Sequence, residues 1–237
     1  MIAIVALLIA LVLPAIRNMR DRGAMAQCQS NLRQAGGLVL LYASSNDGYL
    51  PVWRAQQDAW YQVLQRAGLS SERGNPAFYC PVTPKNGVRG RGQFMWTNPD
   101  YGLNIDLTQY GRGADAVAKT LASIPRPAQT VMMAETGNLG GNPDAPLGGD
   151  YRFFPTRFGF VQNGPMPFMT DYPNHSWLCF RHPRPGPGFN QEGGSAHVLF
   201  FDGHVEALVF DDPRLHSQED RSLMFLGDPD SIWAPSL

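Results

Sequence analysis

Two histidines and a glutamate near the C-terminus are the residues whose types best suit metal binding. His197, His204 and Glu206 fall on one face of the β-hairpin that the sequence predicts around Asp202-Gly203. Imidazole nitrogens and carboxylate oxygens together form a ligand set for zinc or iron. On that face, however, His197 and His204 lie at opposite ends, too far apart to share one ion. We therefore interpret the set as a polar, solvent-facing surface and predict no metal site there.

No arrangement of residues typical of catalysis stands out in the sequence. Ser195 and His197 share one face of a strand, which alone does not make a nucleophile and its base. The sequence contains no glycine-rich phosphate loop, no Gly-x-Ser-x-Gly elbow and no His-Glu-x-x-His. We therefore expect a non-enzyme.

The hairpin itself is predicted from its turn. Asp-Gly is a favoured pair for a two-residue type I′ turn, and alternating apolar residues flank it. Such a turn pairs Phe200 with Val205 and Val198 with Ala207. One face then becomes entirely apolar and is expected to pack on a helix; it consists of Ala196, Val198, Phe200, Val205, Ala207 and Val209. Asp202 and Gly203 are explained by the positive φ that this turn requires, and a contact with a neighbouring subunit is the alternative.

The N-terminal segment has the composition of a membrane helix. Met1–Ile16 contains no charged or polar side chain, and Pro14 is its only interruption. A spanning helix needs about 20 apolar residues, so we expect a membrane segment whose beginning is missing, or else a short signal anchor.

The helix is predicted to continue past this segment. Apolar residues recur at intervals of three and four, a seam that faces a partner; they are Met25, Cys28, Leu32, Ala35, Val39 and Tyr42. The side opposite this seam, which includes Asn31, is polar. Gly36-Gly37 indicates a kink or a close backbone contact, and Asn46-Asp47-Gly48 ends the helix. Residues 1–48 are therefore predicted to form a stalk helix, with residues 1–16 as its membrane part.

The remaining residues, 49–237, are predicted to form a loop-rich globular head. Gly and Pro number 25 and 20, and charged residues make up only 16% of the chain. The formal net charge of -1 gives no field that would attract nucleic acid. A short helix is expected over Asp58–Gly68, strands over Thr130–Ala134 and Trp177–His182, and a long surface excursion over Gly137–His175.

Five segments in order resemble the type IV pilin-like proteins, specifically the prepilin-type group abundant in planctomycetes. The segments are Cys28–Pro51, Tyr79-Cys80-Pro81, Asp100–Asn104, Ile124–Thr136 and Gly193–Val205. That group is described by a His, nine residues and then Asp-Gly. Here nineteen residues separate His182 from Asp202, and removing the ten of Pro183–Glu192 as a loop insertion leaves nine.

The resemblance implies a pilin-like α+β fold, with a long N-terminal helix on a small antiparallel sheet. Family members begin with a basic leader, a Gly-Phe cleavage site and an early Glu, none of which is present here. We expect about eight leading residues to be missing from the hydrophobic helix, which would restore a full span. The full-length precursor would then be cut by a prepilin peptidase and methylated at its new N-terminus.

The resemblance also brings calcium into consideration, because relatives in the type II secretion systems bind it in the head. The carboxylates that could offer oxygens here are Asp211, Asp212, Asp228 and Asp230. Their spacing is not that of a calcium loop. We therefore expect no cofactor, with calcium as the only one that the resemblance suggests.

Three cysteines allow three disulfide pairings, or three reduced thiols. The resemblance favours Cys28–Cys80, because Tyr79-Cys80-Pro81 recurs with the helix cysteine in that group. This bond would tie the stalk to the head. His182 is expected to cap or brace the hairpin, whose motif includes Gly193, Gly194, Asp202, Gly203 and His204.

The expected function is therefore structural. The resemblance implies a subunit of a type IV pilus-like or type II secretion pseudopilus filament, whose partners are copies of itself or other pilin-like subunits. Its helix would sit in the inner membrane before assembly, through Met1–Ile16, and in the filament core afterwards. The head would be periplasmic or extracellular. The alternative is a membrane-anchored module that binds a glycan or protein through Gly137–His175 and uses the helix only as a tether.

Overall fold

The computed structural model describes residues 2–51, 59–70, 75–82, 99–104, 119–124, 126–137, 152–153, 177–178, 180, 182, 194–209 and 212. The long helix α1 (Ile2–Ser44) is followed by the short helix α2 (Trp60–Arg66) and by two 3-10 turns, at Pro76–Phe78 and Leu121–Ser123. The strands are β1 (Tyr101–Asn104), β2 (Val131–Gly137), β3 (Arg152–Phe153), β4 (Trp177–Leu178), β5 (Ser195–Phe200) and β6 (Val205–Val209). Most of the expected excursion Gly137–His175 lies outside the described residues.

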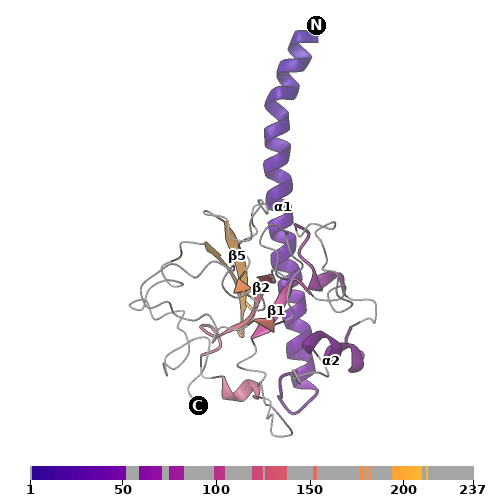
Figure 1. Ribbon diagram of the computed structural model, residues 1–237, viewed down its shortest axis with the longest axis vertical. Coiled ribbons are helices and arrows are strands. Elements are labelled where there is room, and N and C mark those ends of the chain that lie inside the picture. The colour runs from indigo at the N-terminus through magenta and orange to yellow at the C-terminus, as the bar shows by residue number, and fades with distance from the viewer. Residues whose placement is uncertain are drawn as a thin grey trace.

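The first half of α1 projects away from the rest of the described chain, as Figure 1 shows. Every described side chain between residues 2 and 20 is exposed, and Ile2 and Leu7 expose 88% and 63% of their surface. This helix is long and apolar enough to cross a membrane, a property that signal sequences share. Pro14 lies within the helix without ending it.

The second half of α1 packs along the sheet through the predicted seam. Its side chains are fully buried at Cys28, Leu32, Ala35, Val39 and Ala43. Asn31 was expected on the polar side but is 7% exposed, because its amide finds a partner in the head. The helix ends at Ser44, and the turn that follows contains two residues with positive φ, Asp47 and Gly48. The predicted helix end is therefore confirmed to within a few residues.

The head contains a small antiparallel sheet, with strands β1, β2, β5 and β6 side by side in that order. The two-residue strand β3 adds to β1 in parallel, and β4 pairs antiparallel with the end of β2. A register shift between Val131 and Met133 marks a bulge in β2, which lets both Met132 and Met133 contribute to the main core. An α+β fold with a long N-terminal helix is thus confirmed.

The hairpin forms, but its predicted register is wrong by one residue. Leu199 pairs with Val205 and Val198 with Glu206. The loop therefore has three residues, Phe201 to Gly203: the Phe200 carbonyl accepts from Gly203 N at 3.0 Å, and Phe200 N donates to the His204 carbonyl at 3.0 Å. Gly203 has a φ of 91°, whereas Asp202 is not among the described residues with positive φ. The observed loop is a type I turn followed by one residue with positive φ, which is Gly203. Asp-Gly therefore suits this loop as well as it suits a type I′ turn.

The face of β5 that packs on the helix is also the opposite of the one predicted. Leu199 and Phe201 belong to the main core beside α1, and the Leu199 side chain lies against Gly36 of that helix. Ala196, Val198 and Phe200 are buried too, on the other face. Because both faces of β5 are buried, alternation of apolar residues could not identify the face that meets the helix.

Candidate functional site

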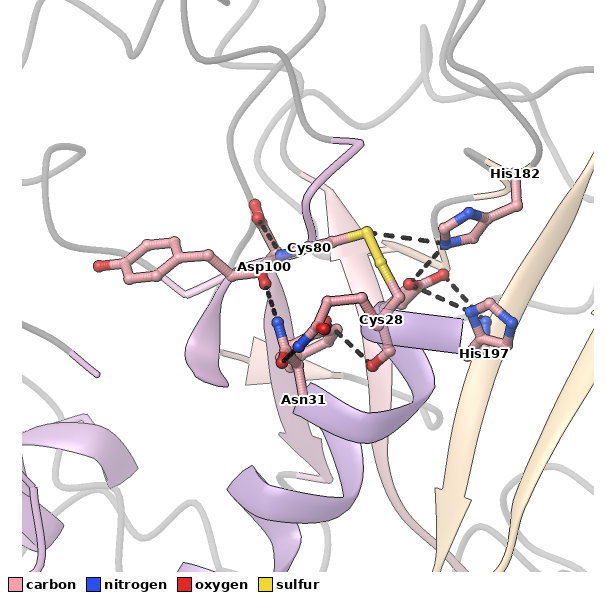
Figure 2. Close-up of a disulfide and its surroundings, with 10 residues drawn as sticks. Cys28, Asn31, Cys80, Asp100, His182 and His197 are labelled. Atoms are coloured by element: carbon pink, nitrogen blue, oxygen red, sulfur yellow. Dashed lines mark hydrogen bonds and ion pairs between the residues drawn. A yellow bond between two sulfur atoms is a disulfide. The ribbon is translucent and has the colours of Figure 1, made fainter. Parts of the chain in front are cut away.

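A buried carboxylate, Glu135 of β2, is the centre of a polar cluster inside the core. Its Oε1 atom lies 2.9 Å from His182 Nε2 and 3.3 Å from His197 Nδ1, and its Oε2 accepts a 3.0 Å hydrogen bond from His197 N. The side chains of all three residues are completely buried. We call Glu135, His182 and His197 the buried triad. In Figure 2 the two labelled histidines lie on the same side of the disulfide.

Strand pairing brings the buried triad together from three segments. Ala134 pairs with Val198 across β2 and β5, and continuing that register by one residue places Glu135 opposite His197. His182 joins from the chain beyond β4 through an antiparallel bridge with Ser195, in which each backbone N donates to the other's carbonyl at 3.1 and 3.0 Å. His182 thus lies against the first residue of the hairpin, as the expected bracing role requires.

The environment keeps Glu135 ionised. Burial by itself raises the pKa of this carboxyl, but hydrogen bonds and charge from His182 and His197 outweigh burial and hold the pKa of Glu135 well below its ordinary value. A buried charge of this kind is tolerated only while it is paired and hydrogen-bonded.

Two nitrogens of the buried triad have no partner among the described residues. These atoms are His182 Nδ1 and His197 Nε2, and both are buried. A buried polar atom without a hydrogen bond costs about 1–3 kcal/mol. Such atoms are uncommon in native proteins.

A disulfide joins Cys28 of α1 to Cys80, next to the buried triad. The two Cα atoms lie 5.1 Å apart, and both residues are buried. Cys80 Sγ lies 3.7 Å from His182 Nε2. This is the pair that the pilin-like resemblance favours; the third cysteine, Cys179, lies outside the described residues. The bond fixes the helix to a segment 52 residues away, which by loop entropy is worth about 4 kcal/mol.

Hydrogen bonds also lie on the other side of the disulfide (Figure 2). Asn31 Nδ2 donates to the Tyr79 carbonyl at 2.8 Å and so joins the two segments that the disulfide joins. The other two bonds tie each of these segments to the start of β1: Cys80 N donates to Asp100 Oδ2 at 2.8 Å, and the Tyr101 hydroxyl donates to the Cys28 carbonyl at 3.2 Å. No individual role was predicted for Asn31, Asp100 or Glu135. The available signal was that each falls within one of the five segments that carry the pilin-like resemblance.

The motif residues at the hairpin turn form a separate, exposed group. His204 Nδ1 lies 2.6 Å from Asp202 Oδ1, which also accepts a 3.1 Å hydrogen bond from His204 N. The His204 ring stacks on Phe200, with centroids 4.1 Å apart. These contacts give Asp202, Gly203 and His204 a structural role in the turn. Gly194 is buried, and Gly193 lies outside the described residues.

The predicted set of His197, His204 and Glu206 does not come together. His197 was expected at a solvent-facing surface and is instead buried in the core, whereas His204 is exposed at the turn. Glu206 pairs with Val198 and so lies on the other face of the hairpin from His197. Of the four carboxylates considered for calcium, only Asp212 is described, and it is buried.

No family model, no curated protein and no solved structure matches this chain. Function is therefore inferred from the chain's own residues. Two features have to be explained: an exposed apolar helix, and a sulfur, histidine and carboxylate cluster that joins this helix to the head.

Proposed function

We propose that this protein is a pilin-like structural subunit, held in the inner membrane by the first part of α1 and assembled through that helix into a filament. The observation that carries the proposal is the exposed apolar surface of α1. Side chains such as Leu7, Leu8 and Ile9 expose more than half of their surface. An apolar surface of this extent is not stable in water, so lipid or other protein must cover it.

The continuity of α1 favours a filament subunit over a tethered module. One unbroken helix of 43 residues runs from the apolar surface into the core of the head. The disulfide and the Asn31–Tyr79 hydrogen bond hold its second half there. A head joined in this way keeps a fixed orientation to its apolar helix, which repeated packing in a helical assembly requires.

Assembly then needs no new type of surface. In the membrane the apolar half of α1 is covered by lipid, and in a filament the same surface is covered by the helices of neighbouring copies. Such a contact joins different patches of successive subunits and does not close on itself, so it continues as a helical filament.

The proposal is tested on cells that make the full-length native protein. We expect antibody against the head to label filaments by electron microscopy, and the sheared extracellular fraction to contain the protein. Leu8→Asp, in the apolar half of α1, should abolish both signals by placing a charge on the buried surface of the assembly. Arg33→Gln, at an exposed position in the second half of α1, is the matched control and should change neither the labelling nor the extracellular fraction.

A different result would overturn the filament proposal. If the protein stays monomeric in the membrane fraction and its head retains a glycan or protein ligand, the helix is only a tether. The molecule would then be the anchored binding module considered as the alternative.

A further inference from the structure

The disulfide and the buried triad together form a set of metal donors. One donor atom from each of Cys28, Cys80, Glu135 and His182 lies within 4.8 Å of the other three, and all four residues are buried. They come from α1, from the segment after the first 3-10 turn, from β2 and from the chain beyond β4. The donors comprise two sulfurs, one imidazole nitrogen and one carboxylate oxygen, each of which is a ligand of zinc.

Two of the distances already approach those of a tetrahedral zinc site. With Zn–S near 2.3 Å and Zn–N and Zn–O near 2.0–2.1 Å, tetrahedral geometry puts N and O about 3.3 Å apart and S and N about 3.6 Å apart. His182 Nε2 lies 2.9 Å from Glu135 Oε1 and 3.7 Å from Cys80 Sγ. The main change needed is that the two sulfurs separate, which requires opening of the disulfide.

The surroundings also resemble those of a metal site more than those of a simple disulfide. A disulfide needs no carboxylate beside it, and Glu135 is nevertheless completely buried there. His197 contacts the Glu135 carboxylate at both oxygens: its backbone N donates to Oε2, and its ring Nδ1 lies 3.3 Å from Oε1. Second-shell hydrogen bonds of this kind orient the carboxylate ligands of metal ions.

We propose that the reduced protein binds one Zn²⁺ through Cys28, Cys80, Glu135 and His182, and that formation of the Cys28–Cys80 disulfide expels the ion. Reduction by a dithiol transfers two electrons and two protons, opens the Sγ–Sγ bond to two thiols and converts the dithiol to its own disulfide. Zn²⁺ then displaces the two thiol protons into solvent. In the reverse direction, a disulfide oxidant accepts two electrons from the thiolates, its own S–S bond opens and its two sulfurs take protons from solvent. The Sγ–Sγ bond re-forms and Zn²⁺ leaves.

Both states perform the same mechanical task. Either the disulfide or the metal joins α1 to the head at Cys28, so the helix stays fixed whichever state is present. The site is closed, with four protein ligands, which is typical of structural rather than catalytic zinc. The proposal does not depend on filament assembly.

The test uses the full chain in detergent, with Cys179→Ser throughout so that only Cys28 and Cys80 can supply thiols. The protein is reduced with a dithiol, freed of it by gel filtration without oxygen, and loaded with Zn²⁺ or Co²⁺. We expect one metal per chain by elemental analysis, and the thiolate charge-transfer and tetrahedral bands of cobalt. Oxidation should release the zinc to a chelating dye in step with the loss of thiols. The proposal is overturned if the reduced protein binds no stoichiometric metal, or if the disulfide form binds it equally well.

Variants identify the ligands. His182→Gln should abolish tight binding, because it removes a ligand. His197→Gln should weaken binding by about 10–100-fold, as expected for an outer-shell partner. His204→Gln, which alters an exposed imidazole outside the cluster, is the control and should bind as the parent does. Unchanged affinity in His182→Gln would overturn the assignment. If that variant does not fold, the cobalt spectrum of the parent decides, because thiolate bands must be present.

Discussion

Gly36 of α1 lies directly against Leu199 of β5, with no room between them for a side chain. A Cβ built on Gly36 would overlap Leu199 Cδ2 and come within 2.7 Å of Met132 Cε. The next residue, Gly37, is exposed and has nothing within 4 Å of the same position. The close approach of helix and sheet therefore depends on one of these two glycines and not on the other.

This difference predicts opposite effects for two neighbouring substitutions. Gly36→Ala should destabilise the head by up to about 2 kcal/mol, because the ends of the buried Leu199 and Met132 side chains must move, an overpacking cost of about 1–3 kcal/mol that exceeds the helix-propensity gain of about 1 kcal/mol. Gly37→Ala should stabilise it by up to about 1 kcal/mol, since alanine is the better helix former and meets nothing. Thermal unfolding of the full chain in detergent, followed by near-ultraviolet circular dichroism, measures both. Equal stability of the two variants would contradict the packing of Gly36.

The buried triad should be far more sensitive to loss of its charge than the exposed pair at the turn. Glu135→Gln leaves two buried imidazoles beside a neutral amide and should cost about 3–5 kcal/mol, as for a broken buried ion pair. Asp202→Asn keeps an oxygen acceptor for His204 N and alters a pair that is 37% and 44% exposed, so it should cost at most about 1 kcal/mol. Denaturant unfolding of the disulfide form compares them. A small effect at Glu135 would mean that the carboxylate is not held as a buried ion.

The amphipathic part of the helix was predictable, and the reason is periodicity. Cys28, Leu32, Ala35 and Val39 recur at the helical interval and are all fully buried. Asn31 broke the rule that polar residues face solvent, because its amide is satisfied by the Tyr79 carbonyl, 48 residues away. Sequence periodicity carries no information about such a distant partner.

The buried triad was not predictable, because strand pairing over long separations creates it. Glu135 and His197 are 62 residues apart in the sequence. The sequence pattern of a strand also does not distinguish a buried histidine from one that faces solvent. The hairpin register failed for a local reason: Asp-Gly fits loops of two and of three residues, and the choice moves every cross-strand pair by one position. The existence of the hairpin followed from the sequence, but its register did not.

Loss of the disulfide should destabilise the metal-free head substantially. Replacing both Cys28 and Cys80 by serine removes a link between residues 52 positions apart. We expect the free energy of unfolding to fall by about 4 kcal/mol. The matched control is Cys179→Ser, which leaves this link intact and should have a smaller effect. Both are measured by denaturant unfolding with a chelator present. Equal losses in the two proteins would contradict a structural role for the Cys28–Cys80 bond.

The three-residue loop can be distinguished from a type I′ turn by substitutions at Asp202 and Gly203. In a type I′ turn both residues have positive φ, so Asp202→Gly would relieve strain and stabilise the hairpin. In the observed loop only Gly203 has positive φ, and Asp202 Oδ1 accepts from His204 N at 3.1 Å. Asp202→Gly should therefore destabilise the head by about 1 kcal/mol through the lost hydrogen bond.

Gly203→Ala should also cost about 1 kcal/mol, in this case through the backbone alone, because nothing lies within 4 Å of the added Cβ. Thermal unfolding of the two variants beside the parent measures both effects. Since both turn types require a positive φ at Gly203, the loss there shows only that the loop tolerates no alanine. The sign of the stability change in Asp202→Gly decides the register. A loss of stability supports the pairing of Leu199 with Val205, whereas a gain would favour the two-residue type I′ turn.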